Sequence, residues 1–137
     1  MASPVKRSDK LKRLVAVQRH LEKMAEHELA GTTRHRAEIN QSMDEVIDAI
    51  GSLNPVHRQF SQQYAERFGR LTVKERQLAG VQQIQEMKVL RERTKGDRLT
   101  ENMKDARDHE DRETADNSIY ELIDITLSIQ AADAYKG

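Results

Sequence analysis

Two prolines, Pro4 and Pro55, limit this chain more than any other residues, because both stand where a helix can begin and proline interrupts a helix elsewhere. Near the second proline, Gly51 suits the left-handed end of a helix, Asn54 suits an N-cap, and Pro55 suits the first helical position. Charged, helix-favouring sequence without proline lies on both sides. One turn between two long helices therefore predicts a rod that folds back on itself near Leu53.

The composition agrees with long helices rather than a compact core. Of the 137 residues, 34 % are charged and only 4 % aromatic. A high content of Ala, Glu, Lys, Leu and Arg with helical periodicity indicates a coiled coil. Disorder is the competing interpretation, because charge is high and hydrophobicity low. The regular spacing of the apolar residues instead favours one elongated helical domain over residues 1–137.

Several protein classes are not favoured. The chain has no cysteine, and so neither a disulfide framework nor thiol chemistry. No stretch approaches the roughly 20 apolar residues of a membrane span. The basic residues Lys6 and Arg7 are not followed by the apolar region of a Sec-type signal peptide. We expect a soluble, cytoplasmic protein.

The first helix is expected from about residue 4 to residue 50, before a turn at 51–54. Its heptad repeat is apolar at both ends and weak in the middle. The weak middle includes Gly31, which costs about 1 kcal/mol of helix propensity relative to Ala. One register contains Leu11, Gln18, Ala25, Thr32, Ile39, Val46 and Leu53, and its neighbouring seam positions are Leu14, Leu21 and Glu28.

The second helix is expected from residue 55 to about residue 113. A bend near residue 53 pairs Val46 with Phe60 and Leu29 with Leu78, and brings the region of Gly80 close to the first helix. This pattern predicts an all-α fold, a long antiparallel two-helix coiled-coil hairpin. The face of the second helix contains Phe60, Tyr64, Leu71, Leu78 and Val81, and after a small drift Ile84, Met87 and Leu90.

A short C-terminal helix or extension is expected over residues 117–135, the amphipathic segment with the densest apolar content. Ser118 and Glu121 resemble a capping box, although residues 125–129 also alternate like a strand. The apolar face can pack near the base of the hairpin, pair with a second copy, or bind a partner, and these three alternatives stay open. Self-association would use Ile119, Leu122, Ile123 and Ile129.

No catalytic constellation is present in the sequence. It has no phosphate loop and neither glycine-rich nor nucleophile-elbow motifs. His20, His27 and His35 are seven and eight residues apart, whereas a metal site prefers closer spacing and a convergent carboxylate. We interpret them as polar coiled-coil positions. We expect no catalytic, cofactor-binding or metal-binding residues, no cofactor, and no enzymatic activity.

Two features bear on partners. The basic N-terminal segment is not accompanied by interleaved aromatics, and the net charge is zero, so nucleic-acid binding is not favoured. Phe60, Tyr64 and Phe68 lie beside the turn. They can simply hold the tip together, or Phe68, with Tyr64, can present an aromatic edge to a partner protein.

The segments 10–19 (KLKRLVAVQR) and 22–30 (EKMAEHELA), then a midpoint turn and a longer second helix rich in Glu, Arg and Gln, resemble a known family. They look like the FliJ/YscO central-stalk proteins of bacterial type III export systems. The resemblance covers most of residues 8–113. It implies a non-enzymatic stalk, similar to the rotor stalk of rotary ATPases, that enters the hexameric export ATPase and reaches the membrane export gate.

The resemblance also implies where partners bind. The base, residues 8–25 with about 85–113, would face the ATPase, through Lys10, Arg13 and Arg19. The tip would contact the gate, and export chaperones are further expected partners. Flagellar and injectisome systems both fit, and the oligomeric state stays open. The alternatives are a self-associating structural coiled coil and a helical chaperone or regulatory module that binds a partner helix. The expected tip residues are Asn40, Tyr64, Phe68 and Leu71.

Overall fold

The computed structural model describes residues 4–136, and every regular element in this range is an α-helix. Helix α1 spans Arg7–Ile50, α2 spans Pro55–Gln59, and α3 spans Ser61–Lys136. The all-α prediction is therefore confirmed. Among residues 4–136, none of the helices combines the length and apolar content that a bilayer crossing requires.

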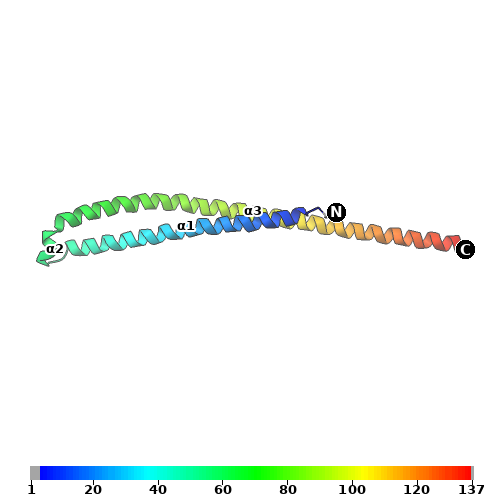
Figure 1. Ribbon diagram of the computed structural model, residues 1–137, viewed down its shortest axis with the longest axis horizontal. Helices are drawn as coiled ribbons and strands as arrows, with labels where there is room; N and C mark the ends of the chain where they lie inside the picture. Colours follow the sequence, from blue (N-terminus) through cyan, green and yellow to red (C-terminus); the bar gives the residue numbers. More distant parts are fainter. Residues whose placement is uncertain (1–3, 137) are drawn as a thin grey trace. The chain divides into compact units, whose positions relative to one another are not determined.

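The chain forms two compact units. The turn unit is Gln18–Gly96, where α1 and α3 lie side by side and α2 joins them at one end (Figure 1). The terminal unit combines residues 4–17 with residues 97–136. Each unit therefore contains parts of both long helices.

The connection between α1 and α3 differs in part from the expectation. Asn54 accepts a hydrogen bond of 3.0 Å from the Val56 N–H, so its predicted role as an N-cap next to Pro55 is confirmed. The predicted left-handed conformation of Gly51 is wrong, because no glycine among residues 4–136 has a positive φ. Its N–H instead continues the helical pattern, with a 3.0 Å bond to the carbonyl of Ile47.

The seam of the turn unit follows a heptad repeat on both helices. Its most buried side chains are Ala25, Ile39, Val46 and Val89, each no more than 5 % exposed. Alternating steps of three and four residues are the signature of coiled-coil packing. The buried or half-buried seam positions are Gln18, Glu22, Ala25, Leu29, Thr32, Arg36, Ile39, Met43 and Val46 on α1, and Tyr64, Phe68, Leu71, Glu75, Leu78, Gln82, Gln85, Val89, Glu92 and Gly96 on α3.

Polar pairs occupy several seam positions. The guanidinium of Arg36 donates to Glu75 Oε1 at 2.6 Å and to Gln82 Oε1 at 2.8 Å. The Gln18 amide donates to the Glu92 carbonyl at 3.1 Å and also to its carboxylate. The contacts along α1 and α3 run in opposite sequence order, which is compatible with the predicted hairpin.

The pairing register differs from the expected one. A bend at residue 53 would place Gln18 opposite residue 88 and Arg36 opposite residue 70, whereas the observed partners are Glu92 and Glu75. The connection is longer than a four-residue turn, because α2 and the non-helical Phe60 are part of it. The chain therefore turns around α2 rather than at Leu53, which is 82 % exposed.

Several apolar residues assigned to the seam lie outside it. Leu14 and Leu21 are 51 % and 43 % exposed, and Val15 and Glu22 take the neighbouring seam positions. The predicted close approach at Gly80 is also wrong, because nothing lies within 4 Å of a Cβ placed there. Phe60, which precedes α3, was expected in the seam but is exposed. On α3 the residues expected in the seam but exposed are Val81, Ile84, Met87 and Leu90.

The second long helix does not stop near residue 113. α3 continues to Lys136 and includes the segment 117–135, so this segment is a helical extension and not a strand. Residues 111–135 are all exposed. We call residues 113–135 the C-terminal arm.

Gly31 and Gly96 give a test of the seam. A Cβ on Gly31 meets nothing within 4 Å, so Gly31→Ala should gain helix propensity and raise the free energy of unfolding by about 1 kcal/mol. A Cβ on Gly96 would lie 2.6 Å from Arg19 Nη1, so Gly96→Ala must displace that side chain and should stabilise less. Urea unfolding of both variants checks the difference. Equal gains would show that Gly96 does not lie tightly against α1.

Candidate interaction surfaces

The expected base residues differ in how available they are. Lys10 and Arg13 are exposed on α1. Arg19 is half-buried, and its Nη1 pairs with Glu22 Oε2 at 2.8 Å. Lys10 and Arg13 can therefore meet an acidic partner directly, whereas Arg19 is already engaged within the chain.

A carboxylate of α3 caps the first turn of α1. The Ser8 N–H donates to Glu110 Oε1 at 3.0 Å, and the Ser8 hydroxyl donates to Glu110 Oε2. These bonds hold the pKa of Glu110 below its usual range, first through the hydroxyl and then through the N–H. A negative charge at this position also matches the partial positive charge of a helix N-terminus. The contact fixes where α1 begins along α3.

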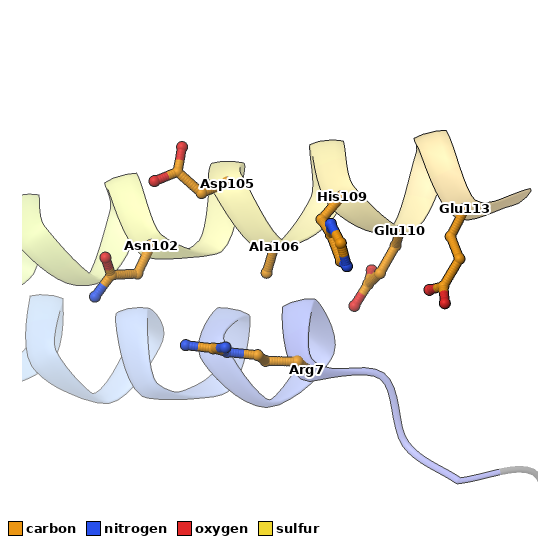
Figure 2. A pocket seen from close by; sticks show the side chains of 7 residues that line it. All are labelled: Arg7, Asn102, Asp105, Ala106, His109, Glu110 and Glu113. Carbon is orange, nitrogen blue, oxygen red and sulfur yellow. The ribbon is translucent and has the colours of Figure 1, made fainter. Parts of the chain in front are cut away.

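A polar cavity of about 420 Å³ lies beside this cap. Figure 2 shows Arg7 extending from α1 below Asn102 and Ala106, with the side chains of His109, Glu110 and Glu113 descending from α3. The carboxylates of Asp105, Glu110 and Glu113 and the Arg7 guanidinium line it together. Across residues 4–136, no group of three or more potential ligand side chains is arranged to hold a metal ion.

The three histidines singled out in the sequence are not among the residues that line that cavity. His20 and His27 are exposed on α1, and His35 is half-buried.

The tip contains an aromatic cluster, but its composition differs from the expected one. His57 Nδ1 lies 3.1 Å from the Tyr64 hydroxyl, and the two ring centroids are 5.9 Å apart. Phe60 packs on Tyr64 with centroids 6.4 Å apart and is 45 % exposed. Phe68 and Leu71 are half-buried seam residues. Phe60, rather than Phe68, is therefore the more exposed ring.

Asn40 lies apart from this cluster. It is exposed on α1, and the observed pairing of Arg36 with Glu75 places it further along the seam from the aromatic rings than a bend at residue 53 implied.

An apolar groove in the middle of the turn unit was missed by the sequence reasoning. Its volume is about 830 Å³. It lies where the repeat was expected to be weak, and small residues on α1 leave space there. The signal that points to it is Ala30 and Ala37, seven residues apart on one side of α1. The lining residues include Leu29, Ala30, Thr33, Ala37, Val89 and Leu90.

The C-terminal arm exposes most of its large apolar residues. Ile119, Leu122, Ile123 and Ile129 are 47–64 % exposed. A surface cavity of about 340 Å³ lies along the first three, beside Thr126 and Leu127. Contiguous exposed apolar residues are typical of protein interaction sites.

Comparison with models of protein families, with curated proteins and with solved structures found no match.

The Glu110 cap predicts a pH dependence. Because its pKa in the folded chain is lowered from the usual 4.5, the cap stabilises the fold above that value and loses this effect as the pH falls through the lower pKa. The pKa of Glu92 is lowered in the same direction, chiefly by the Gln18 hydrogen bond. Glu110→Gln should therefore melt at a lower temperature than the natural protein at neutral pH.

The difference between the two proteins should shrink in acid, once Glu110 is protonated in both states of the natural protein. Thermal unfolding followed by circular dichroism across this pH range measures it. Hydrogen exchange of the first turns of α1 should be faster in Glu110→Gln. A constant difference at all pH values would contradict the role of the charge.

Proposed function

We propose that this protein is a non-enzymatic stalk or adaptor of a bacterial type III export apparatus, flagellar or injectisome. In this proposal, an antiparallel coiled-coil hairpin couples the export ATPase to the membrane export gate. The segments 10–19 and 22–30 resemble the central-stalk family, and the packing of α1 on α3 with reversed contact order is compatible with its layout.

One observation carries the adaptor role. The seam places polar side chains between the helices while many large aliphatic side chains remain outside. Gln82, Gln85 and Glu92 are at seam positions, whereas Ile84 and Leu122 are 69 % and 64 % exposed. Large aliphatic side chains that stay exposed add little to the stability of a protein without partners, because buried apolar area is the main source of stability. The outward apolar residues therefore favour a role in binding other proteins.

The second candidate is a helical chaperone or regulatory module. The apolar groove of the turn unit favours it, because a groove between two helices can accept the apolar face of a third. In this case the groove, rather than the ends of the hairpin, would hold the partner.

The base assignment gives a first test. Lys10→Glu with Arg13→Glu should weaken co-purification with the export ATPase about tenfold or more, because reversed charges then face an acidic partner surface. Both side chains are exposed, so the fold should persist. Arg70→Glu with Lys74→Glu changes two exposed charges near the tip and is the matched control. Unchanged ATPase binding by the Lys10 and Arg13 variant would refute the base assignment.

The tip assignment gives a second test. Asn40→Arg adds bulk and charge at an exposed position without touching the seam, whereas Tyr64→Ala with Phe68→Ala removes two half-buried rings. Both variants should lose export in a strain that lacks the natural protein, while retaining helical circular dichroism. Val73→Ala, at a position 55 % exposed, is the control. Full export by both variants would show that the tip makes no contact with the gate.

A further inference from the structure

The apolar stripe of the C-terminal arm lies on a side of α3 that α1 does not use. The seam of the terminal unit on α3 contains Leu99, Met103, Ala106 and Glu110, all half-buried. The same steps continue to Glu113, Asn117, Tyr120 and Asp124, which are mostly polar. The stripe Ile119, Leu122, Thr126 and Ile129 comes two residues later in the repeat.

A shift of two residues in the repeat places the side chains on a very different side of the helix. Each residue turns an α-helix by about 100°, so the stripe lies on nearly the opposite side of α3 from the seam. The stripe therefore does not pack on α1, which was one of the three alternatives for covering this face. Among residues 4–136, no element covers this face.

The charges around the stripe have a single sign. Between residues 113 and 135 there are five acidic residues and no Lys, Arg or His. Within residues 4–136, none of these five carboxylates takes part in an ion pair. An apolar stripe with unpaired acidic neighbours is complementary to a basic surface. The five residues are Glu113, Asp116, Glu121, Asp124 and Asp133.

The same charges oppose pairing of two arms. In a parallel pair each Asp116 would lie near its own counterpart, and in an antiparallel pair centred on the stripe Asp116 would lie near Asp133. Like charges across a helix pair are destabilising in both cases. Anionic membranes and nucleic acids are disfavoured for the same reason.

We propose that the C-terminal arm docks a basic amphipathic helix of a partner protein. The partner helix carries its own apolar stripe, which covers Ile119, Leu122 and Ile129 and the adjacent Ile123. Its Lys and Arg side chains meet Asp116 and Glu121, which flank the stripe. This inference deepens the proposed adaptor function by giving the arm a partner of defined chemistry. It involves a surface separate from the base and the tip.

Four synthetic helical peptides test this proposal on the full-length protein, by fluorescence anisotropy. Two peptides are basic and two acidic, and one of each pair carries an apolar stripe at alternating steps of three and four. The basic peptide with the stripe should bind. The peptides without the stripe should bind at least about tenfold more weakly, because burial of even one or two large side chains accounts for such a ratio. The acidic peptide with the stripe should also bind more weakly than the basic one, because its charges would face acidic side chains of the arm.

Variants of the arm identify the site. Leu122→Ser with Ile123→Ser should weaken binding of the striped basic peptide about tenfold or more, and both positions are exposed, so the seam remains intact. Ile84→Ser changes an equally exposed aliphatic side chain of the turn unit and should bind like the natural protein. Raised salt should weaken binding, since the acidic side chains are exposed.

Distinct results would overturn the proposal. Equal binding of the striped acidic and basic peptides would remove the charge argument. A dimer in sedimentation that dissociates in the Leu122 and Ile123 variant would assign the stripe to a second copy. Binding to vesicles rich in anionic lipid, lost in the same variant, would assign it to a membrane. None of these measurements needs the export ATPase or gate, so the outcome is separate from the tests of export function.

Discussion

The ion pair of Arg36 with Glu75, and the hydrogen bonds of Gln18 to Glu92, set the alignment of the two helices in the turn unit. Small apolar side chains such as Ala25 can slide by one heptad with little loss. A charged side chain in the seam cannot, because it would leave its partner buried and unpaired. Polar seam positions contribute little net stability, but they select one register among several similar ones.

The sequence was sufficient for the all-α class and for the extent of α1, but not for the ends of the later helices or for the pairing register. The Asn54 cap with Pro55 and the repeat through Leu11, Gln18, Ala25, Ile39 and Val46 follow from local patterns, and the structure has both. The pairing was displaced because α2 and Phe60 lengthen the connection. The length of the connection depends on how the few residues between the helices fold. The heptad repeat along either helix does not predict that length.

Nor could the sequence distinguish apolar residues that lie in the seam between α1 and α3 from apolar residues that face away from it. Leu14, Leu21 and Leu90 fit a helical spacing, yet Glu22, Gln85 and Glu92 occupy the seam. Hydrophobic periodicity assigns a face to each helix and assumes that the apolar face is the inner one. Here Gln18 and Arg36 have partners on the facing helix, Glu92 and Glu75, and only the three-dimensional pairing reveals them. The amide oxygen of Gln85 is buried without a hydrogen-bond partner among residues 4–136.

The two-residue offset in the arm has a thermodynamic consequence. The partner helix proposed for the outward stripe of α3 would touch none of the residues that hold α1 in place, such as Ser8 and Glu110. Binding of that partner and separation of α1 from α3 would then be independent equilibria, with little coupling free energy between them. A partner helix docked as proposed could therefore bind and dissociate without breaking the contact between Ser8 and Glu110.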